Sequence, residues 1–294
     1  MSPADETIGF VGVGLMGHGI AKNILVSGYP LAVIAHRERT RVEDLLSSGA
    51  TEAESLKELG ENASIVFICA PGSPQVEVIV RELKSGLKSG SVIVDCSTSD
   101  PNSTAALAEE LEPLGGTPVQ AAEGTLGAMV GARDDVFARL KPVIETWAAS
   151  VVHIGAIGDG HRMKLLNNFL SLGYGAIYAE ALVLAGKVGL SPERFDRVIR
   201  GSRMDCGFYQ TFMAYVLDGN REAHKFTLTN AVKDLRYLES MANAAGLSNP
   251  IDNAVKNAFA VAYAGGGDGP EDYVPTLPEH VARLNGTEFK AGEA

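Results

Sequence analysis

The chain has 294 residues, of which 46% are hydrophobic and 21% are charged, a balance typical of globular proteins with one large or two medium domains. Its 36 acidic and 25 basic residues leave a formal net charge of −11, which argues against nucleic acid or an anionic membrane as the main partner. The three cysteines are too few and too scattered for a disulfide framework or a zinc site. The N-terminal MSPADETIGF lacks the basic and apolar regions of a signal peptide, and no apolar stretch free of charges and multiple glycines is long enough to span a membrane. We therefore expect a cytoplasmic protein with no membrane partner.

The first half of the chain alternates apolar runs with amphipathic patterns. The apolar runs, typical of buried strands, are residues 7–14, 31–36, 63–71, 91–97 and 151–154. The helical patterns are residues 15–28, which Gly28 closes, 75–87 and 101–115. Strands separated by helices of this length predict a parallel, doubly wound sheet, and near-continuous apolar strands fit because helices cover both of its faces.

The pattern changes beyond about residue 159. Residues 163–189 predict one long helix that is apolar nearly all round and hence buried, between domains or subunits. Only helical patterns follow, over residues 191–202, 226–246 and 249–266. The glycine cluster at 265–269 and the polar tail after it predict a frayed end. We therefore expect an α/β domain of residues 1–158 and an all-α domain of residues 159–294, with the long helix between them.

A glycine-rich run follows the first predicted strand and opens the first predicted helix. Gly12-Val13-Gly14-Leu15-Met16-Gly17 has the spacing G-x-G-x-x-G. In a βαβ unit these glycines serve a tight turn, close approach of the backbone to a pyrophosphate and helix–strand packing. The start of the helix then offers free N–H groups to the phosphates. The run, with Leu15 and Met16 at the first helical turn, predicts a Rossmann-type dinucleotide site.

The end of the second predicted strand bears on which dinucleotide binds. An acidic residue there would bind the ribose 2′-hydroxyl of NAD, but the strand-end position holds His36, with Arg37 and Arg39 after it. The two arginines could meet the 2′-phosphate of NADP. Glu38 could serve NAD if the strand ran longer. We expect NADP as the cofactor, with NAD as the alternative.

Lys164 and Asn168 are the polar pair of the long helix. They are four residues apart and share one helix face. A lysine in an apolar helix is costly to bury without a partner or a function. The segment around the pair is GAIGDGHRMKLLNN, with glycines at 155, 158 and 160.

This segment resembles the G-x-x-G-x-G-x-x-x-K-x-x-N-N motif of the β-hydroxyacid dehydrogenases. The family includes 3-hydroxyisobutyrate dehydrogenase and tartronate semialdehyde reductase, and 6-phosphogluconate dehydrogenase is a more distant relative. The likeness extends over nearly the whole chain. GFVGVGLMGHGIAKNIL is similar to the family's opening, CAPGSPQV to its loop against the cofactor, DCSTSDP to its D-x-S-T-x-x-P segment and VKDLRYL to its K-D-L motif.

The resemblance implies an NAD(P)-dependent oxidoreductase that interconverts a short 3-hydroxy acid and its semialdehyde by hydride transfer. It makes Lys164 the general acid/base, and Asn168 would hydrogen-bond the lysine or the substrate oxygen. Because a free lysine has a pKa of about 10.4, we expect partial burial beside the cationic nicotinamide to lower the pKa of Lys164. The expected partners are a small anionic hydroxy acid or semialdehyde and further copies of the chain, in a homodimer or homotetramer.

Further positions carry over from the same motifs. The resemblance places Ala70 and Pro71 in the loop against the cofactor and Thr98 near the nicotinamide ribose. It places Lys233 over the active site, in reach of cofactor and substrate anion, with Arg203 as a second candidate for the anion. The histidines lack the spacing of metal ligands, so we expect no metal and ordinary surface or boundary histidines, of which His161 stands out because it lies on the Lys164 segment.

One segment departs from the family pattern. The family carries D-x-P-V-[ST]-G-[GS], whose serine and glycines hold the substrate carboxylate, whereas residues 117–126 here read TPVQAAEGTL and lack the Ser-Gly pair. Either the protein has lost this loop, or a stretch around Val119–Ala122 is missing from the sequence. Two alternative functions stay open. One is an imine reductase, which the Lys164–Asn168 pair disfavours, and the other is an NADP-binding sensor without catalysis, which the short loop would support.

Overall fold

The computed structural model describes residues 6–35, 39–111, 117–124 and 127–292, and for residues 117–124 the backbone alone. The chain divides into two compact units, Met1–Lys164 and Leu165–Ala294. The division lies inside one continuous helix, α7 (Asp159–Lys187). The boundary expected from the sequence, at residues 158–159, coincides with the start of this helix.

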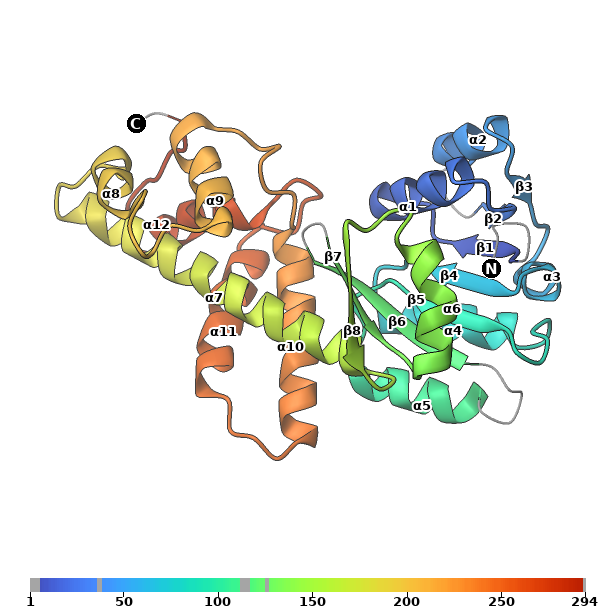
Figure 1. Ribbon diagram of the computed structural model, residues 1–294. Coiled ribbons are helices and arrows are strands. Elements are labelled where there is room, and N and C mark those ends of the chain that lie inside the picture. The colour runs from blue at the N-terminus through green and yellow to red at the C-terminus, as the bar shows by residue number, and fades with distance from the viewer. Residues whose placement is uncertain (1–5, 36–38, 112–116, 125–126, 293–294) are drawn as a thin grey trace. The chain divides into compact units, whose positions relative to one another are not determined.

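The first unit is built on one sheet with the strand order β3-β2-β1-β4-β5-β6-β7-β8 (Figure 1). Its strands are β1 (Ile8–Val11), β2 (Leu31–Ile34), β3 (Thr51–Glu52), β4 (Ile65–Ile68), β5 (Val92–Asp95), β6 (Thr117–Gly124), β7 (Gly127–Gly131) and β8 (Ser150–Gly155). Its helices are α1 (Leu15–Val26), α2 (Arg39–Ser47), α3 (Leu56–Asn62), α4 (Ser73–Leu83), α5 (Pro101–Leu111) and α6 (Asp134–Ile144). The pairs from β3 through β6 are all parallel, which confirms the predicted doubly wound sheet.

The far edge of the sheet differs from the prediction. β6 pairs antiparallel with β7, so β7 and its parallel neighbour β8 run opposite to the other strands. Only two residues separate Gly124 from its partner Gly127, and so short a connection can join only antiparallel strands. The segment Val119–Ala122 lies within β6, where Val119 and Gln120 pair with β5 and Gln120 to Ala122 pair with β7.

Apolar cores lie against both faces of the sheet. Helices α1, α2 and α6 cover one face through Ile24, Leu45 and Leu140 among others. Helices α3, α4 and α5 cover the other face through Leu59, Val80 and Leu111. The central strands β1, β4 and β5 are buried at every position, which explains why their sequences are continuous apolar runs rather than alternating ones.

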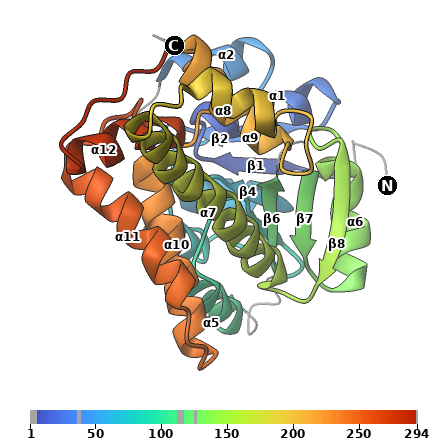
Figure 2. The same cartoon turned by 90° about the vertical axis from the view of Figure 1, so that its left-hand side faces the viewer.

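The second unit is entirely helical in its described residues (Figure 2). Besides α7 it contains α8 (Pro192–Ile199), α9 (Gly207–Asp218), α10 (Leu228–Ala244), α11 (Pro250–Ala264), a 3-10 turn η3 (Val274–Thr276) and α12 (Leu277–Leu284). Its core includes Leu172 of α7, Phe212 of α9, Leu235 of α10 and Phe259 of α11.

The residues that follow the glycine cluster are not a frayed end. Tyr273 forms an isolated bridge with Thr227, and Val274 and Leu277 are fully buried in the core of the second unit. The expectation failed because a few apolar residues interleaved with prolines carry no clear helical period in the sequence. Tertiary contacts, rather than local propensity, order this segment.

Helix α7 is buried along one side only, whereas its composition predicted burial nearly all round. Leu165, Leu172, Ala179 and Leu182 lie in the core of the second unit. Another side exposes a row of apolar residues that continues one residue past the end of the helix, each 45–66% exposed: Leu166, Leu170, Tyr174, Ile177, Leu184 and Val188. Among the described residues, α7 is the one helix whose length and hydropathy suit a membrane span, although it contains Glu180 and several glycines. A core helix of a soluble protein passes the same test.

A buried carboxyl group lies near the start of α11. Asp252 is 1% exposed and accepts a hydrogen bond from Asn249 Nδ2 (2.8 Å). The ammonium of Lys256, one turn further on, is itself paired with Glu239 of α10 (2.5 Å). Burial raises the pKa of Asp252 to about 6, an effect that Lys256 opposes only in part. The folded state therefore binds this proton more tightly than the unfolded state does.

We predict that Asp252→Asn stabilises the protein at about pH 8 but not at about pH 4. A carboxyl whose pKa is raised on folding destabilises the fold as pH rises through that pKa, here by about 1–3 kcal/mol above pH 6. The amide mimics the neutral acid, so the melting temperature of the variant should exceed that of the wild type by several degrees at the higher pH. Asp218→Asn, at an exposed position of α9, is the matched control and should change the melting temperature at neither pH. Equal melting temperatures for D252N and wild type at high pH would contradict the prediction.

Candidate active site and cofactor-binding loops

The glycine run forms the turn between β1 and α1, and each glycine has a distinct steric reason. Gly12 has φ +95°, and a Cβ on it would lie 2.1 Å from the carbonyl oxygen of Cys69. A Cβ on Gly17 would lie 2.0 Å from the carbonyl oxygen of Gly12. A Cβ on Gly14, by contrast, would meet no atom of the described residues within 4 Å. The first and third glycines close the turn, and the second borders open space where a pyrophosphate could approach the backbone.

The start of α1 presents donors to that space. Gly14 is the N-cap, and no described side chain caps the helix. The first backbone N–H groups of an α-helix have no partner within the helix, so they can bind phosphate oxygens. Leu15 and Met16, the first two residues of α1, are 66% and 54% exposed. The segment thus fits a dinucleotide by backbone geometry as well as by sequence pattern.

Three of the predicted cofactor segments meet at one edge of the sheet. β1, β4 and β5 are neighbours and parallel, so the residues after their carboxyl ends lie side by side. These residues are the glycine run, the Ala70–Pro71 segment and the Cys96–Thr98 segment. The backbone N–H of Ala70 donates to Ser97 Oγ (2.8 Å), which joins the last two segments. The strand order reverses between β1 and β4, and ligands of open α/β sheets bind at such a switch point.

Of the three residues proposed to distinguish NADP from NAD, the structure describes Arg39. His36 and Arg37 lie outside the described residues. Arg39 begins α2 and forms ion pairs with Glu52 (2.5 Å) and Glu43 (3.3 Å). These carboxylates, Glu52 foremost, raise the pKa of Arg39. A 2′-phosphate would have to share this guanidinium with them.

The Lys164 segment starts α7 through a specific turn. Gly155 and Gly158 have φ values of +144° and +94°, in the region that favours glycine. Asp159, the first residue of the helix, closes this turn, because its Oδ2 accepts a hydrogen bond from the backbone N–H of Ala156 (2.8 Å). Lys164 follows near the start of α7 and is half-buried.

In the second unit, a buried carboxylate joins two of the predicted site residues. Asn168 is 6% exposed, and its Nδ2 donates to Asp234 Oδ2 (2.6 Å). Lys233 Nζ lies 3.1 Å from the other oxygen of Asp234 and 5.5 Å from the centroid of the Tyr237 ring. The structure therefore places Asn168 and Lys233 at one carboxylate, while Arg203 is exposed.

Sequence analysis assigned no role to Asp234, which is 2% exposed. A signal was available, because Asp234 lies on the helix face of Ala231 and Leu238, and an acid on an apolar face is costly unless it is paired. His161 was expected at a surface or boundary but has no exposed surface, and its Nδ1 lies 2.9 Å from Thr104 Oγ1. This expectation is wrong because the imidazole is enclosed beside Asp95, at the end of β5, and Thr104 of α5.

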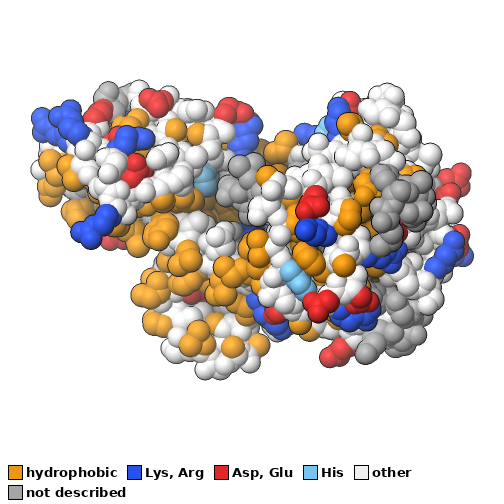
Figure 3. Space-filling view, in the orientation of Figure 1, with side chains coloured by type: hydrophobic (Ala, Val, Ile, Leu, Met, Phe, Trp, Pro, Cys, Tyr) orange, Lys and Arg blue, Asp and Glu red, His pale blue; other side chains and the backbone are white. Residues whose placement is uncertain are grey.

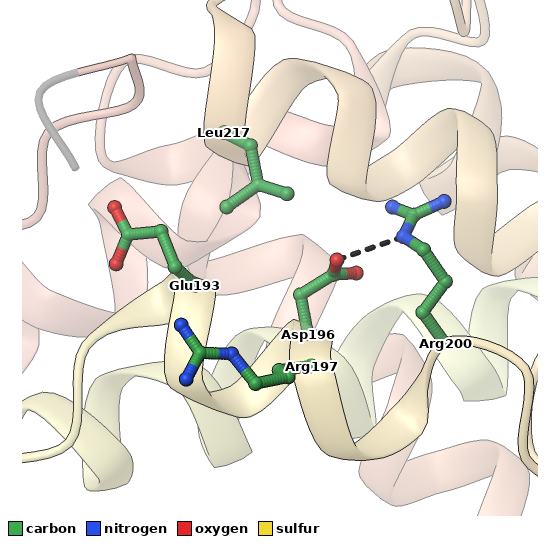
Figure 4. Close-up of a pocket in the computed structure, with 5 residues that line it drawn as sticks. All are labelled: Glu193, Asp196, Arg197, Arg200 and Leu217. Atoms are coloured by element: carbon green, nitrogen blue, oxygen red, sulfur yellow. Dashed lines mark hydrogen bonds and ion pairs between the residues drawn. The ribbon is translucent and has the colours of Figure 1, made fainter.

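A surface cavity of about 500 Å³ in the second unit contains none of the predicted site residues. It is lined by Glu193, Asp196, Arg197, Arg200 and Leu217, from α8, the residue after it and α9 (Figure 4). Arg200 Nε pairs with Asp196 Oδ2 (2.7 Å), so part of the charge is neutralised locally. A mixed, solvated set of charges gives no basis for binding a dinucleotide or a small acid there. Within the described residues, no group of three or more His, Cys, Asp or Glu could hold a metal ion.

Two family models match the chain. Residues 7–155 match the NAD binding domain of 6-phosphogluconate dehydrogenase, and residues 158–275 match the model described as NAD-binding of NADP-dependent 3-hydroxyisobutyrate dehydrogenase. The chain is 33% identical to 2-hydroxy-3-oxopropionate reductase of Escherichia coli over 88% of the chain and 92% of that protein. It is 31% identical to mitochondrial 3-hydroxyisobutyrate dehydrogenase of Mus musculus over 83% of the chain and 78% of that protein.

Solved structures show the same fold. The 3-hydroxyisobutyrate dehydrogenase of Mycobacterium tuberculosis has a TM-score of 0.80 at 23% identity, covering 92% of this chain and 98% of that one. An imine reductase from Pseudomonas sp. has a TM-score of 0.59 at 18% identity, covering 94% and 99%, and shares the fold alone. The sequence matches to the two relatives, at 33% and 31% identity, show the family as well as the fold. The chain therefore belongs to the β-hydroxyacid dehydrogenase family of NAD(P)-dependent oxidoreductases, whose members act on short hydroxy acids and their semialdehydes.

Proposed function

We propose that this protein interconverts a short 3-hydroxy acid and its semialdehyde, with Lys164 as the general acid/base. The observation that carries the proposal is the placement of Lys164 and Asn168 four residues apart on α7, with Asn168 fixed by the buried Asp234. Bound nicotinamide would supply or accept the hydride at C4. Lys164 would give a proton to the aldehyde oxygen during reduction and take it from the hydroxyl during oxidation.

Asn168 has a positioning task in this scheme. Its Nδ2 is committed to Asp234, so the carbonyl oxygen Oδ1, on the other side of the amide, is the atom that can accept a hydrogen bond from Lys164 or from the substrate hydroxyl. Lys233 supplies positive charge for the substrate anion, and Asp234 and the ring of Tyr237 restrain its ammonium group.

For the coenzyme we propose NADP, held at the 2′-phosphate by Arg37 and Arg39. Support comes from the lack of a carboxylate at the strand-end position His36 and from the exposed guanidinium of Arg39. Glu52 competes for Arg39, so the preference for NADP should be moderate rather than absolute.

The experiment for the proposed function is a panel of short semialdehydes followed by oxidation of NADPH and NADH. The panel contains succinic, methylmalonic and tartronate semialdehyde, the last being the substrate named in the 2-hydroxy-3-oxopropionate reductase relative. We expect turnover with at least one compound and a higher kcat/KM with NADPH. A flat panel from a protein that binds NADPH would contradict the proposal and favour the sensor hypothesis.

Lys164→Ala should bind NADPH like the wild type and lose turnover by a factor of about 10²–10⁴, because proton transfer to the carbonyl oxygen is lost while the glycine run is untouched. Steady-state kinetics with the best semialdehyde and a fluorescence titration of NADPH test this. Lys187→Ala is the matched control on the same helix, since Lys187 lies at its other end and donates to the carbonyl oxygen of Asn285 (2.8 Å). Near-normal turnover in K164A would rule out the assignment.

We also propose that the exposed apolar row of α7 binds a second copy of the chain. Its six residues follow intervals of four, four, three, seven and four, which keeps them on one helix face. Figure 3 shows hydrophobic side chains gathered along this helix and over α11. Glu180 and Arg162 border the row, and charges at a border suit the polar rim of a protein interface better than lipid.

The double variant Leu170→Glu/Ile177→Glu should shift the protein to a monomer in light scattering coupled to size-exclusion chromatography, because two like charges would lie in the interface. Val78→Glu is the control, as Val78 of α4 is similarly exposed, at 54%, in the first unit. The wild type and V78E should both run as a homodimer or homotetramer. A monomeric wild type, or one that sediments with phosphatidylglycerol vesicles, would contradict the proposal.

A further inference from the structure

A buried polar network lies beneath the cofactor-binding edge of the first unit, with Asp95 at its centre. Asp95 ends β5 and is 7% exposed. Its Oδ1 accepts the backbone N–H of Ser97 (2.8 Å), and its Oδ2 accepts the hydroxyl of Ser99 (2.7 Å). Ser97 Oγ in turn accepts the backbone N–H of Ala70. One carboxylate thus orders both the segment that contains Thr98 and the segment that contains Ala70.

The first turn of α7 joins the same network through His161. The imidazole has no exposed surface, and its Nε2 lies 3.6 Å from Asp95 Oδ2 while its Nδ1 lies 2.9 Å from Thr104 Oγ1 of α5. A hydrogen on Nε2 would face this carboxylate favourably, whereas a nitrogen lone pair there would be repelled. The hydroxyl of Thr104, a residue that is 5% exposed, lies near both this Nδ1 and the carbonyl oxygen of Asp100 (3.3 Å). It donates its one hydrogen to one of them, and when it donates to the carbonyl it accepts from Nδ1.

Lys164 follows His161 by three residues on α7, so both side chains leave the helix on one side. A rotation or slide of this turn that broke the contacts of His161 would carry Lys164 with it. The network therefore couples the position of Lys164 to the two segments, after β4 and β5, that face the cofactor.

We infer that His161 is a positioning residue that sets the place of Lys164 relative to the Ala70 and Thr98 segments through Asp95 and Thr104. This inference rests on the proposed role of Lys164. It assigns His161 no contact with substrate or cofactor. It requires a group with two polar ends at this buried position, one toward Asp95 and one toward Thr104.

The test is a series of variants assayed as purified holoenzyme with NADPH and the best semialdehyde of the panel. His161→Leu, which keeps the volume and loses both polar ends, should lower kcat by about ten- to a hundredfold while the Kd for NADPH changes little, because misplacement of an acid/base group by about 1 Å has effects of this size. His161→Gln, whose amide can still donate toward Asp95, should recover most of the loss. Thr104→Val should lower kcat in the same direction by a smaller factor.

His153→Gln is the matched control in the same unit. His153 donates to the carbonyl of Ala132 (2.8 Å) and stacks on Phe137, away from the network, and its variant should keep the kcat of the wild type. If H161L does not fold, the inference is tested by the kcat and the Kd for NADPH of Thr104→Val and His161→Gln. The inference predicts kcat below wild type in T104V with an unchanged Kd for NADPH.

The outcomes separate the two proposals. If K164A loses turnover but H161L and T104V keep that of the wild type, the positioning role of His161 is wrong and the proposed function stands. If K164A keeps turnover, the proposed function fails and the inference fails with it. A loss in H161L that H161Q does not recover, with melting temperature and NADPH affinity lowered in parallel, would mean a purely structural role and would also overturn the inference.

Discussion

The carboxylate of Asp95 is the group on which the cofactor-binding edge of this protein depends. A buried charge is costly in an apolar interior, and the cost is met here by hydrogen bonds from Ser97 and Ser99 and by the facing imidazole of His161. Because its partners come from the turn after β5 and from α7, satisfying one carboxylate orders both segments. Removing a single partner would leave part of the buried carboxylate without a hydrogen bond and would weaken the order of both segments.

The same principle operates independently in the second unit. There Asp234 is buried and binds Asn168 of α7 on one oxygen and Lys233 of α10 on the other. Helix α7 is thus held by a buried carboxylate in each unit, at His161 in one and at Asn168 in the other. Lys164 lies between these two positions in the sequence, so the helix that carries the proposed acid/base has a buried polar contact before it and another after it.

Local sequence signals predict the structure correctly where they agree with the tertiary packing. The run Gly12–Gly17 was assigned to a phosphate-binding turn, and the positive φ of Gly12 and the close contacts at Gly12 and Gly17 give the steric reason for its spacing. Local signals fail where partners distant in sequence decide the conformation. Val274 and Leu277 enter a core built from other helices, and the sequence around them carries no clear helical period.

Short-range periodicity and glycine spacing predict the doubly wound sheet and the dinucleotide turn, and the resemblance of several motifs indicates the family and makes Lys164 and Asn168 candidate site residues. Packing, by contrast, buries His161 against Asp95 and Thr104, joins Asn168 to Lys233 through Asp234, and pairs Arg39 with two carboxylates. Hydrogen bonds and ion pairs between residues separated by dozens of positions depend on how strands and helices pack, which no local pattern encodes.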